Sequence, residues 1–416
     1  MFRMTAGDSK DNTSLAGGGG KWWICILLLL ATLLNYLDRQ VLSLTADKLI
    51  AEFHIDKEGF GWILASFRYP YALAQVFGGW IVDSLGPRSV FPAAVGLWST
   101  AGLLTGFAPS LGILSMCRCI LGTGEAFNWP CALKTTERLL DDRDRPLANG
   151  VFNSGTALGS MIAPVVVTVL AARWGWRSPF IFAGALGGIW VVLWLASTRS
   201  YSVRLGGTPM AAREVVRVLI AIASKRAFWL LATTAVVVNS ANYFLADWIP
   251  LYLKTERGFS FGAGNMLTVL IYAGLDAGNL LAGAFVRTAT RRGVPVDQAR
   301  NLALLISCIL MTCAVLAGVT GSRYLALVCI ILTAMGVAGF LVLYLTLVQD
   351  LDPLHVGAAA GMLGGLGNLV YGVVSPYIGR LADLHQTSLT FTCMGLLPWL
   401  AYLSISRVKR EEPERT

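Results

Sequence analysis

Charged residues are scarce in this chain. Of its 416 residues only 14% are Asp, Glu, Lys or Arg, whereas 55% are hydrophobic and the mean hydropathy is +0.63. A soluble globular protein carries about 25% charged residues. The scarcity of charge excludes an ordinary soluble protein and indicates a membrane protein that crosses the bilayer several times.

The apolar residues gather in blocks of about 20, the length that an α-helix needs to cross the hydrocarbon layer. The weak ten-residue alternation that is typical of a transmembrane barrel is missing. We therefore predict an all-α membrane protein with twelve transmembrane helices in two six-helix bundles. The predicted spans cover residues 22–46, 59–82, 89–107, 111–133, 147–171, a sixth ending near 194, 228–252, 262–286, 299–319, 323–347, 357–379 and 389–405.

Composition also predicts the domain boundaries. Residues 198–226 contain six Lys or Arg and Glu214 as the only acid, which is typical of a cytoplasmic linker between two halves. The part of this linker with Arg213 and Arg217 can lie as an amphipathic helix on anionic lipid. The full prediction is a flexible cytoplasmic tail at 1–20, an N-terminal bundle at 21–197, the linker, a C-terminal bundle at 227–407 and a cytoplasmic tail at 408–416.

The net charge of +9 does not indicate a nucleic-acid partner. Most Lys and Arg fall on the tails and connections of one side of the predicted bundle. This is the positive-inside pattern, and it predicts that both termini are cytoplasmic.

Histidine is nearly absent, and the three histidines, His54, His355 and His385, all lie in predicted loops. The eight cysteines fall in apolar runs, where thiols pack as small hydrophobic groups. A membrane-embedded enzyme would need a nucleophile, a metal cluster or histidines at membrane depth, and the sequence offers none. We therefore expect no enzymatic activity, no cofactor and no metal.

Ionisable residues inside the predicted spans are few and informative. Asp38 and Arg39 lie in the first span, Arg68 in the second, and Arg118 and Glu125 in the fourth. A charge at the centre of a membrane helix costs roughly 2.5 to 3.5 kcal/mol, so such residues usually face a wet cavity or a partner on another helix. Arg118 and Glu125 are two turns apart, too far for a direct pair, so Asp38 and Arg39 are their natural partners. For Arg118 and Asp38, a structural ion pair and a functional role are both open.

Proton coupling would have to use a buried carboxylate, because no histidine lies at membrane depth. Glu125 is the best candidate, with Asp38 and Arg118 beside it. Arg68 either admits a second anionic group or pairs with Asp276 or Asp247, and we favour the pairing. Asp247 lies so close to the end of its span that an interfacial position is a serious alternative.

The second span ends in Gly79-Trp80-Ile81-Val82-Asp83-Ser84-Leu85-Gly86-Pro87-Arg88. Gly79, Asp83, Gly86 and Arg88 match the G-x-x-x-D-x-x-G-x-R pattern, and the chain resembles the major facilitator superfamily, which carries this pattern between helices 2 and 3. Asp83 and Arg88 can form a charge-dipole latch at a helix end. The pattern usually has a basic residue after the aspartate, where this chain has Ser84.

Within that superfamily the chain resembles the anion:cation symporter family. The resemblance is carried by Asn35-Tyr36-x-Asp38-Arg39, Tyr71-x-x-x-Gln75, Arg118-x-x-x-Gly122-x-x-Glu125 and the run from Leu147 to Gly155, and Glu125-Ala126-Phe127-Asn128-Trp129-Pro130 resembles the hexuronate branch. The resemblance implies proton-coupled uptake of an organic anion, with Arg39 and Tyr71 meeting the substrate and Asp38 and Glu125 taking the proton. Arg68 departs from the hexuronate pattern, which has an uncharged residue there.

The prediction is therefore a proton-coupled symporter in the bacterial inner membrane, monomeric, that imports a hexuronate or related sugar acid by alternating access. Transport of another organic anion, such as an aromatic carboxylate or a dicarboxylate, and anion exchange without protons are the alternatives. The predicted substrate-binding residues are Tyr36, Arg39, Tyr71, Gln75, Asn153, Asn242, Tyr243 and Asn368. For Tyr243 a place in the packed core is an equal alternative.

Overall fold

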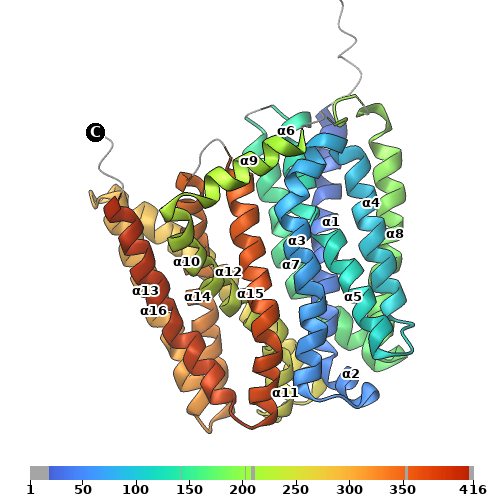
Figure 1. Cartoon of the computed structure of the whole chain (residues 1–416). Coiled ribbons are helices and arrows are strands. Elements are labelled where there is room, and N and C mark those ends of the chain that lie inside the picture. The colour runs from blue at the N-terminus through green and yellow to red at the C-terminus, as the bar shows by residue number, and fades with distance from the viewer. Residues whose placement is uncertain (1–17, 142, 202, 208–210, 352–354, 412–416) are drawn as a thin grey trace, which may run out of the picture.

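The computed structural model describes residues 18–141, 143–201, 203–207, 211–351 and 355–411, in which the regular structure is helical throughout (Figure 1). The helices are α1 (Gly18–Leu44), α2 (Ala46–Phe53), α3 (Lys57–Leu85), α4 (Pro87–Thr105), α5 (Leu111–Glu125), α6 (Asn128–Leu139), α7 (Arg145–Trp174), α8 (Ser178–Ser197), a 3₁₀ turn η1 (Arg199–Tyr201), α9 (Ala212–Ala223), α10 (Arg226–Asp247), α11 (Ile249–Thr255), α12 (Phe261–Arg291), α13 (Val296–Val319), α14 (Arg323–Leu351), α15 (Val356–Asp383) and α16 (Thr387–Glu411).

Nine of the helices in these described residues are long and apolar enough to cross a membrane. The other three predicted spans correspond to α3, to α4 and to α5 together with α6, which run alongside the nine (Figure 1). α3 contains polar and charged residues that lower its hydropathy, and α5 is only 15 residues long. The predicted all-helical membrane fold is confirmed, with its spans close to the expected boundaries.

Two predicted spans are broken within the membrane-length segment. The span at 111–133 divides after Glu125, and Pro130 lies in the first turn of the following α6. The span at 228–252 divides at Trp248, with Pro250 in the first turn of α11. Proline is tolerated in a first turn because its missing N–H has no intrahelical acceptor there. The breaks leave Glu125 and Asp247 each at the last residue of a helix.

The halves have separate apolar cores that merge at one end. One core lies in the N-terminal half around Trp98, Trp190 and Trp194. The other fills the C-terminal half and continues into the N-terminal half through residues such as Leu42 and Phe60. This merging occurs at the end with α2 and α11, here called the far end, opposite the start of α1 and the end of α16 (Figure 1).

Helices α3 and α15 join the two halves by close backbone contact. A Cβ built on Gly61 would lie 2.6 Å from the Cα of Pro376, and one on Gly365 would lie 3.0 Å from the carbonyl oxygen of Ala72. Small residues allow such approach between membrane helices. Arg68 and Gln75 of α3 are therefore carried on a helix that lies directly against the other half.

Residues 198–226, which we predict to be the linker, contain a short α-helix. α9 includes Arg213 and Arg217 and follows the short turn η1. Of the predicted tails, residues 1–17 and 412–416 lie outside the described residues, and the helix α16 extends past residue 407 to Glu411.

Candidate functional site

Arg39 and Glu125 form a buried ion pair between two helices of the N-terminal half. The Nε of Arg39 donates to Oε2 of Glu125 at 2.5 Å. The Glu125 side chain has no exposed area, and that of Arg39 is 17% exposed. α1 is continuous through Asn35–Arg39, while Glu125 ends α5 at the helix break. The expected pairing of Glu125 with a residue of the first span is thus present.

Aromatic rings surround the Arg39 guanidinium. Its Cζ lies 5.3 Å from the ring centroid of Tyr36, 5.5 Å from that of Phe67 and 4.7 Å from that of Tyr71. Cation–π attraction to each ring contributes about 0.5 to 2 kcal/mol, more where water is excluded. The rings stabilise the Arg39 guanidinium but carry no negative charge, so they do not compete with an anion for it.

Arg118 and Asp38 are both buried but do not form the direct pair that we considered. No ion pair within 4.0 Å joins them among the described residues. The Oδ2 of Asp38 and the Nε and Nη1 of Arg118 are buried without a hydrogen-bond partner, and the Arg118 Cζ lies 4.9 Å from the ring centroid of Phe67. Buried polar groups without partners are costly and gather at functional sites. The structural ion pair is therefore the weaker of the two interpretations.

A second ion pair crosses between the halves. The Nη2 of Arg68 donates to Oδ2 of Asp247 at 2.7 Å, and the side chains are only 6% and 9% exposed. The Cζ of Arg68 lies 3.9 Å from the ring centroid of Tyr243, whose ring packs against that of Tyr371. Of the two partners left open by the sequence, Arg68 takes Asp247, and Asp247 is buried inside the protein.

Asn368 connects this second pair to the surrounding polar residues. Its Oδ1 accepts from Nη1 of Arg68 at 3.1 Å. Its Nδ2 donates to the Tyr243 hydroxyl at 2.9 Å and to Oε1 of Gln75 at 3.3 Å. Three of the predicted substrate-binding residues thus meet at one point between α3, α10 and α15.

Three further predicted residues lie apart from these contacts. Asn153 of α7 is exposed, and Asn242 of α10 and Asp276 of α12 are partly buried. None of the three makes a side-chain hydrogen bond or ion pair within the part of the chain that the structure describes. Asp276 lies one helical turn from Tyr272 and shares its face of α12.

The segment Gly79–Arg88, here called the Gly79 loop, is mostly helical: Gly79 and Asp83 lie in the last two turns of α3, Gly86 lies between the helices, and Arg88 lies in the first turn of α4. Oδ1 of Asp83 accepts from Nζ of Lys134 in α6 at 2.9 Å, so an ion pair holds Asp83. Gly86 has φ +83°, and a Cβ there would lie 2.4 Å from the carbonyl oxygen of Leu205. Positive φ and this contact both require glycine. Gly79 faces open space, and the backbone N–H of Arg88 donates to Leu205.

Several charged contacts close the far end between the halves. The Nζ of Lys254 in α11 donates to Oδ1 of Asp47 at 2.6 Å and to the carbonyl of Leu44 at 2.7 Å. The carboxylate of Asp383, the last residue of α15, accepts from the backbone N–H groups of Lys57 and Glu58 at 3.2 and 3.0 Å. The far end is therefore held shut by side chains from both halves.

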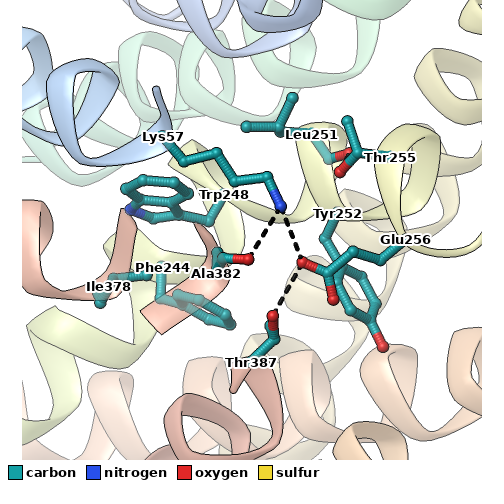
Figure 2. Close-up of a pocket in the computed structure, with 10 residues that line it drawn as sticks. All are labelled: Lys57, Phe244, Trp248, Leu251, Tyr252, Thr255, Glu256, Ile378, Ala382 and Thr387. Atoms are coloured by element: carbon teal, nitrogen blue, oxygen red, sulfur yellow. Dashed lines mark hydrogen bonds and ion pairs between the residues drawn. The ribbon is translucent and has the colours of Figure 1, made fainter. Parts of the chain in front are cut away.

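Figure 2 shows the small pocket next to these contacts. The Nζ of Lys57 reaches between the carbonyl of Ala382 and Oε1 of Glu256, each at 3.3 Å. Thr387 donates to the same Glu256 oxygen at 2.8 Å. Lys57 begins α3, while the other three residues belong to the C-terminal half, so the pocket lies on the boundary between the halves.

A surface contact near α2 also involves a carboxylate. Hydrogen bonds from Trp176 and Arg177 lower the pKa of Glu52 below its usual range. This glutamate lies outside the spans, and its side chain is 43% exposed.

Sequence reasoning did not identify Phe67, Tyr371 or the far-end charges. Phe67 precedes Arg68, and Tyr371 lies three residues after Asn368, so both are close in sequence to predicted site residues. This proximity could have identified them, but aromatic residues in a membrane span are usually assigned to the packed core. Asp47 and Lys254 are 207 residues apart in the chain, and no local pattern links them.

Comparison with known proteins identifies the family. The Major Facilitator Superfamily model matches residues 28–376. The chain belongs to the major facilitator superfamily. It is a multi-pass membrane transporter and not an enzyme, which agrees with the prediction from the Gly79 loop and the intramembrane charges.

Two relatives and one solved structure illustrate the similarity. The chain is 25% identical over 422 residues to the probable galactarate/D-glucarate transporter GarP of Escherichia coli (strain K12), covering 93% of this chain and 95% of that protein. It is 28% identical to the hexuronate transporter of Bacillus subtilis (strain 168), covering 92% and 93%. The crystal structure of a D-xylose-proton symporter superposes with a TM-score of 0.74 at 17% identity, covering 94% of this chain and 98% of that one, and this supports the fold.

Proposed function

We propose that the protein imports a sugar acid together with protons by alternating access. The observation that carries the proposal is the buried Arg39–Glu125 pair. A carboxylate substrate and Glu125 compete for the same guanidinium. When Glu125 takes a proton it no longer holds Arg39, and the arginine can bind the substrate carboxylate through its planar donor groups.

Proton binding and substrate binding are coupled by this competition. An ionised Glu125 beside a bound anion would place two negative charges on one arginine in a region of low dielectric, which is unfavourable. Protonation removes one of them. Asp38 and Arg118, buried nearby, set the local field and belong to the same proton-coupling group.

The neighbouring polar side chains suit the hydroxyl groups of a sugar acid. Tyr36 and Tyr71 lie beside Arg39, and Gln75, Tyr243 and Asn368 form the hydrogen-bonded cluster between the halves. Asn153 and Asn242 complete the proposed set. The relatives, named as transporters of hexuronates and of galactarate and D-glucarate, support a sugar acid, and a hexuronate is the first substrate to test.

Alternating access would use the two ends of the molecule in turn. The far end is the proposed outer side, closed by the contacts of Lys254 and Asp383, and the Asp83–Lys134 pair lies at the proposed inner side. In this orientation both termini are cytoplasmic, in a bacterial inner membrane, and the transporter works as a monomer with residues 198–226 linking its halves.

Reconstitution into lipid vesicles tests the proposal. Uptake of labelled D-glucuronate and D-galacturonate is measured with an inward proton gradient, without one, and with a protonophore. We expect accumulation only with the gradient. Equal uptake with and without the gradient would instead indicate exchange without protons, and no uptake of any sugar acid would remove the proposed substrate class.

A further inference from the structure

The Arg68–Asp247 pair repeats the chemistry of the Arg39–Glu125 pair. In each case an arginine of the N-terminal half contacts a buried carboxylate at the last residue of a broken helix. Each guanidinium also lies close to tyrosine rings, Tyr71 for Arg39 and Tyr243 for Arg68. The two pairs differ in one respect, because the second crosses between the halves.

Structural stability alone is a weak reason for the second pair. Two charges lose much of their hydration on burial, and replacing a buried ion pair by apolar residues of similar volume is often neutral or stabilising. Arg68 also has donor groups beyond the two that contact Asp247 and Asn368. A guanidinium with spare donors at membrane depth is suited to an anion.

The two arginines are close enough for one small molecule to reach both. Both lie close to Phe67, and the Cζ atoms of Arg39 and Arg68 are each 5.5 Å from its ring centroid. The Cζ atoms therefore cannot be farther apart than twice that distance. A short carbon chain with a carboxylate at each end, together with a hydrogen bond at each end, can bridge such a gap.

We propose that Arg68 and Asp247 form a second anion site, so that the preferred substrate is a sugar diacid with one carboxylate on Arg39 and the other on Arg68. This rests on the proposed function and replaces the hexuronate, a monoacid, by a dianion. Gln75, Tyr243 and Asn368, which lie beside Arg68, would meet hydroxyl groups along the chain.

The charges balance if each carboxylate of the protein takes one proton. A dianion displaces both Glu125 and Asp247 from their arginines, and two protons neutralise them, so the loaded site gains no net charge. A monoanion displaces Glu125 alone and brings one proton. The titratable and charged groups that face Asp247 are Arg68 from α3, Arg118 from α5, Tyr272 from α12 and Tyr371 from α15.

Paired open-chain substrates test the inference. Galactarate and D-galactonate differ only in whether the second end is a carboxylate or a hydroxymethyl group. In vesicles, the double variant Arg68→Gln/Asp247→Asn should take up galactarate at least about ten-fold more slowly than the parent, which corresponds to a loss of about 1.4 kcal/mol of binding free energy. Its uptake of galactonate should stay within about two-fold of the parent. Retained galactonate uptake also shows that the variant is folded. Arg173→Gln, at the exposed last turn of α7, is the control for the loss of an arginine outside the proposed site.

Two results would overturn the inference alone. One is an unchanged ratio of galactarate to galactonate uptake in the double variant, whether both rates are kept or both fall equally, and the other is a parent protein that takes up galactonate but not galactarate. If the parent takes up the hexuronates but neither of these acids, only the inference fails; if it takes up no sugar acid at all, the proposed function fails as well. A second measurement needs no variant. Proton uptake by the parent, followed with a pH dye, should be two per galactarate and one per galactonate, and an equal ratio for both would overturn the second site.

Discussion

Replacing Glu125 by glutamine tests the coupling between proton and substrate most directly. Glutamine keeps the shape of the side chain and an oxygen that can accept from Nε of Arg39, which lies 2.5 Å from Oε2 in the parent. It removes the negative charge and the site for the proton. Because the glutamate side chain has no exposed area, the change is confined to the ion pair.

The size of the effect follows from the kind of hydrogen bond that is lost. A hydrogen bond to a charged group contributes about 1.5 to 3 kcal/mol, and a neutral one contributes about 1 kcal/mol. Arg39 is therefore held more weakly in the variant by about 0.5 to 2 kcal/mol. The substrate no longer has to displace that interaction, so its affinity should rise about 2- to 30-fold at neutral pH. The dependence of affinity on pH should flatten.

Vesicle assays separate the two consequences. Glu125→Gln should abolish accumulation driven by a proton gradient and should retain exchange of external labelled for internal unlabelled substrate, because exchange moves no net proton. Glu214→Gln, on the exposed surface of α9, is the matched control and should behave as the parent does. Equal loss of accumulation and exchange, or undiminished accumulation, would refute the role of Glu125.

Four further predictions concern other parts of the structure. Arg39→Lys should weaken substrate binding about ten-fold or more in isothermal titration, since lysine lacks the planar fork. Lys254→Gln should open the far end and speed hydrogen exchange of the amides in α2, since a charge-assisted bond contributes about 1.5 to 3 kcal/mol. Gly86→Ala should lower the free energy of unfolding by more than about 1 kcal/mol, because alanine is strained at the positive φ of this position, and the melting temperature should fall accordingly. Glu52→Gln should lower the free energy of unfolding by less than about 1 kcal/mol at neutral pH and should have no effect in acid. The reason is that the pKa of Glu52 is lower in the folded protein than in the unfolded chain. Such a carboxylate stabilises the fold at a pH above its unfolded pKa and loses that contribution as the pH falls through its folded pKa.

Each of these has an outcome that contradicts it. Unchanged affinity in the lysine variant would remove Arg39 from the substrate site. Unaltered exchange in α2 would mean that Lys254 does not hold the far end. A Gly86→Ala protein as stable as the parent would show that the loop adapts. For Glu52, the difference in melting temperature between variant and parent is measured at neutral pH and at about pH 3. Equal differences at the two pH values would show that the hydrogen bonds of Glu52 contribute no pH-dependent stability.

Much of the fold was predictable because membrane helices follow simple rules. Length and hydropathy predicted the spans, and the two breaks occur near Pro130 and Pro250, where proline can begin a helix but not continue one. The partner of Glu125 was also predictable, since a buried charge without a counter-charge is costly.

The rest of the candidate site depends on distances between helices that the sequence does not contain. The choice of Asp247 over Asp276 for Arg68 depends on how closely α3 and α10 approach, and the separation of Asp38 from Arg118 depends on the rotation of two helices. Phe67 is indistinguishable from a core residue until the three arginines are placed around it.

The glycine contacts between α3 and α15 constrain how the two halves can move. A Cβ on Gly379 would lie 2.1 Å from the carbonyl oxygen of Lys57, so no side chain cushions these backbones at that point. In the proposed alternating access, this line of backbone contact between α3 and α15 would be the axis about which the halves turn. A bulky residue at position 379 would force the two helices apart at that point and would be expected to block the proposed movement without changing Arg39 or Arg68.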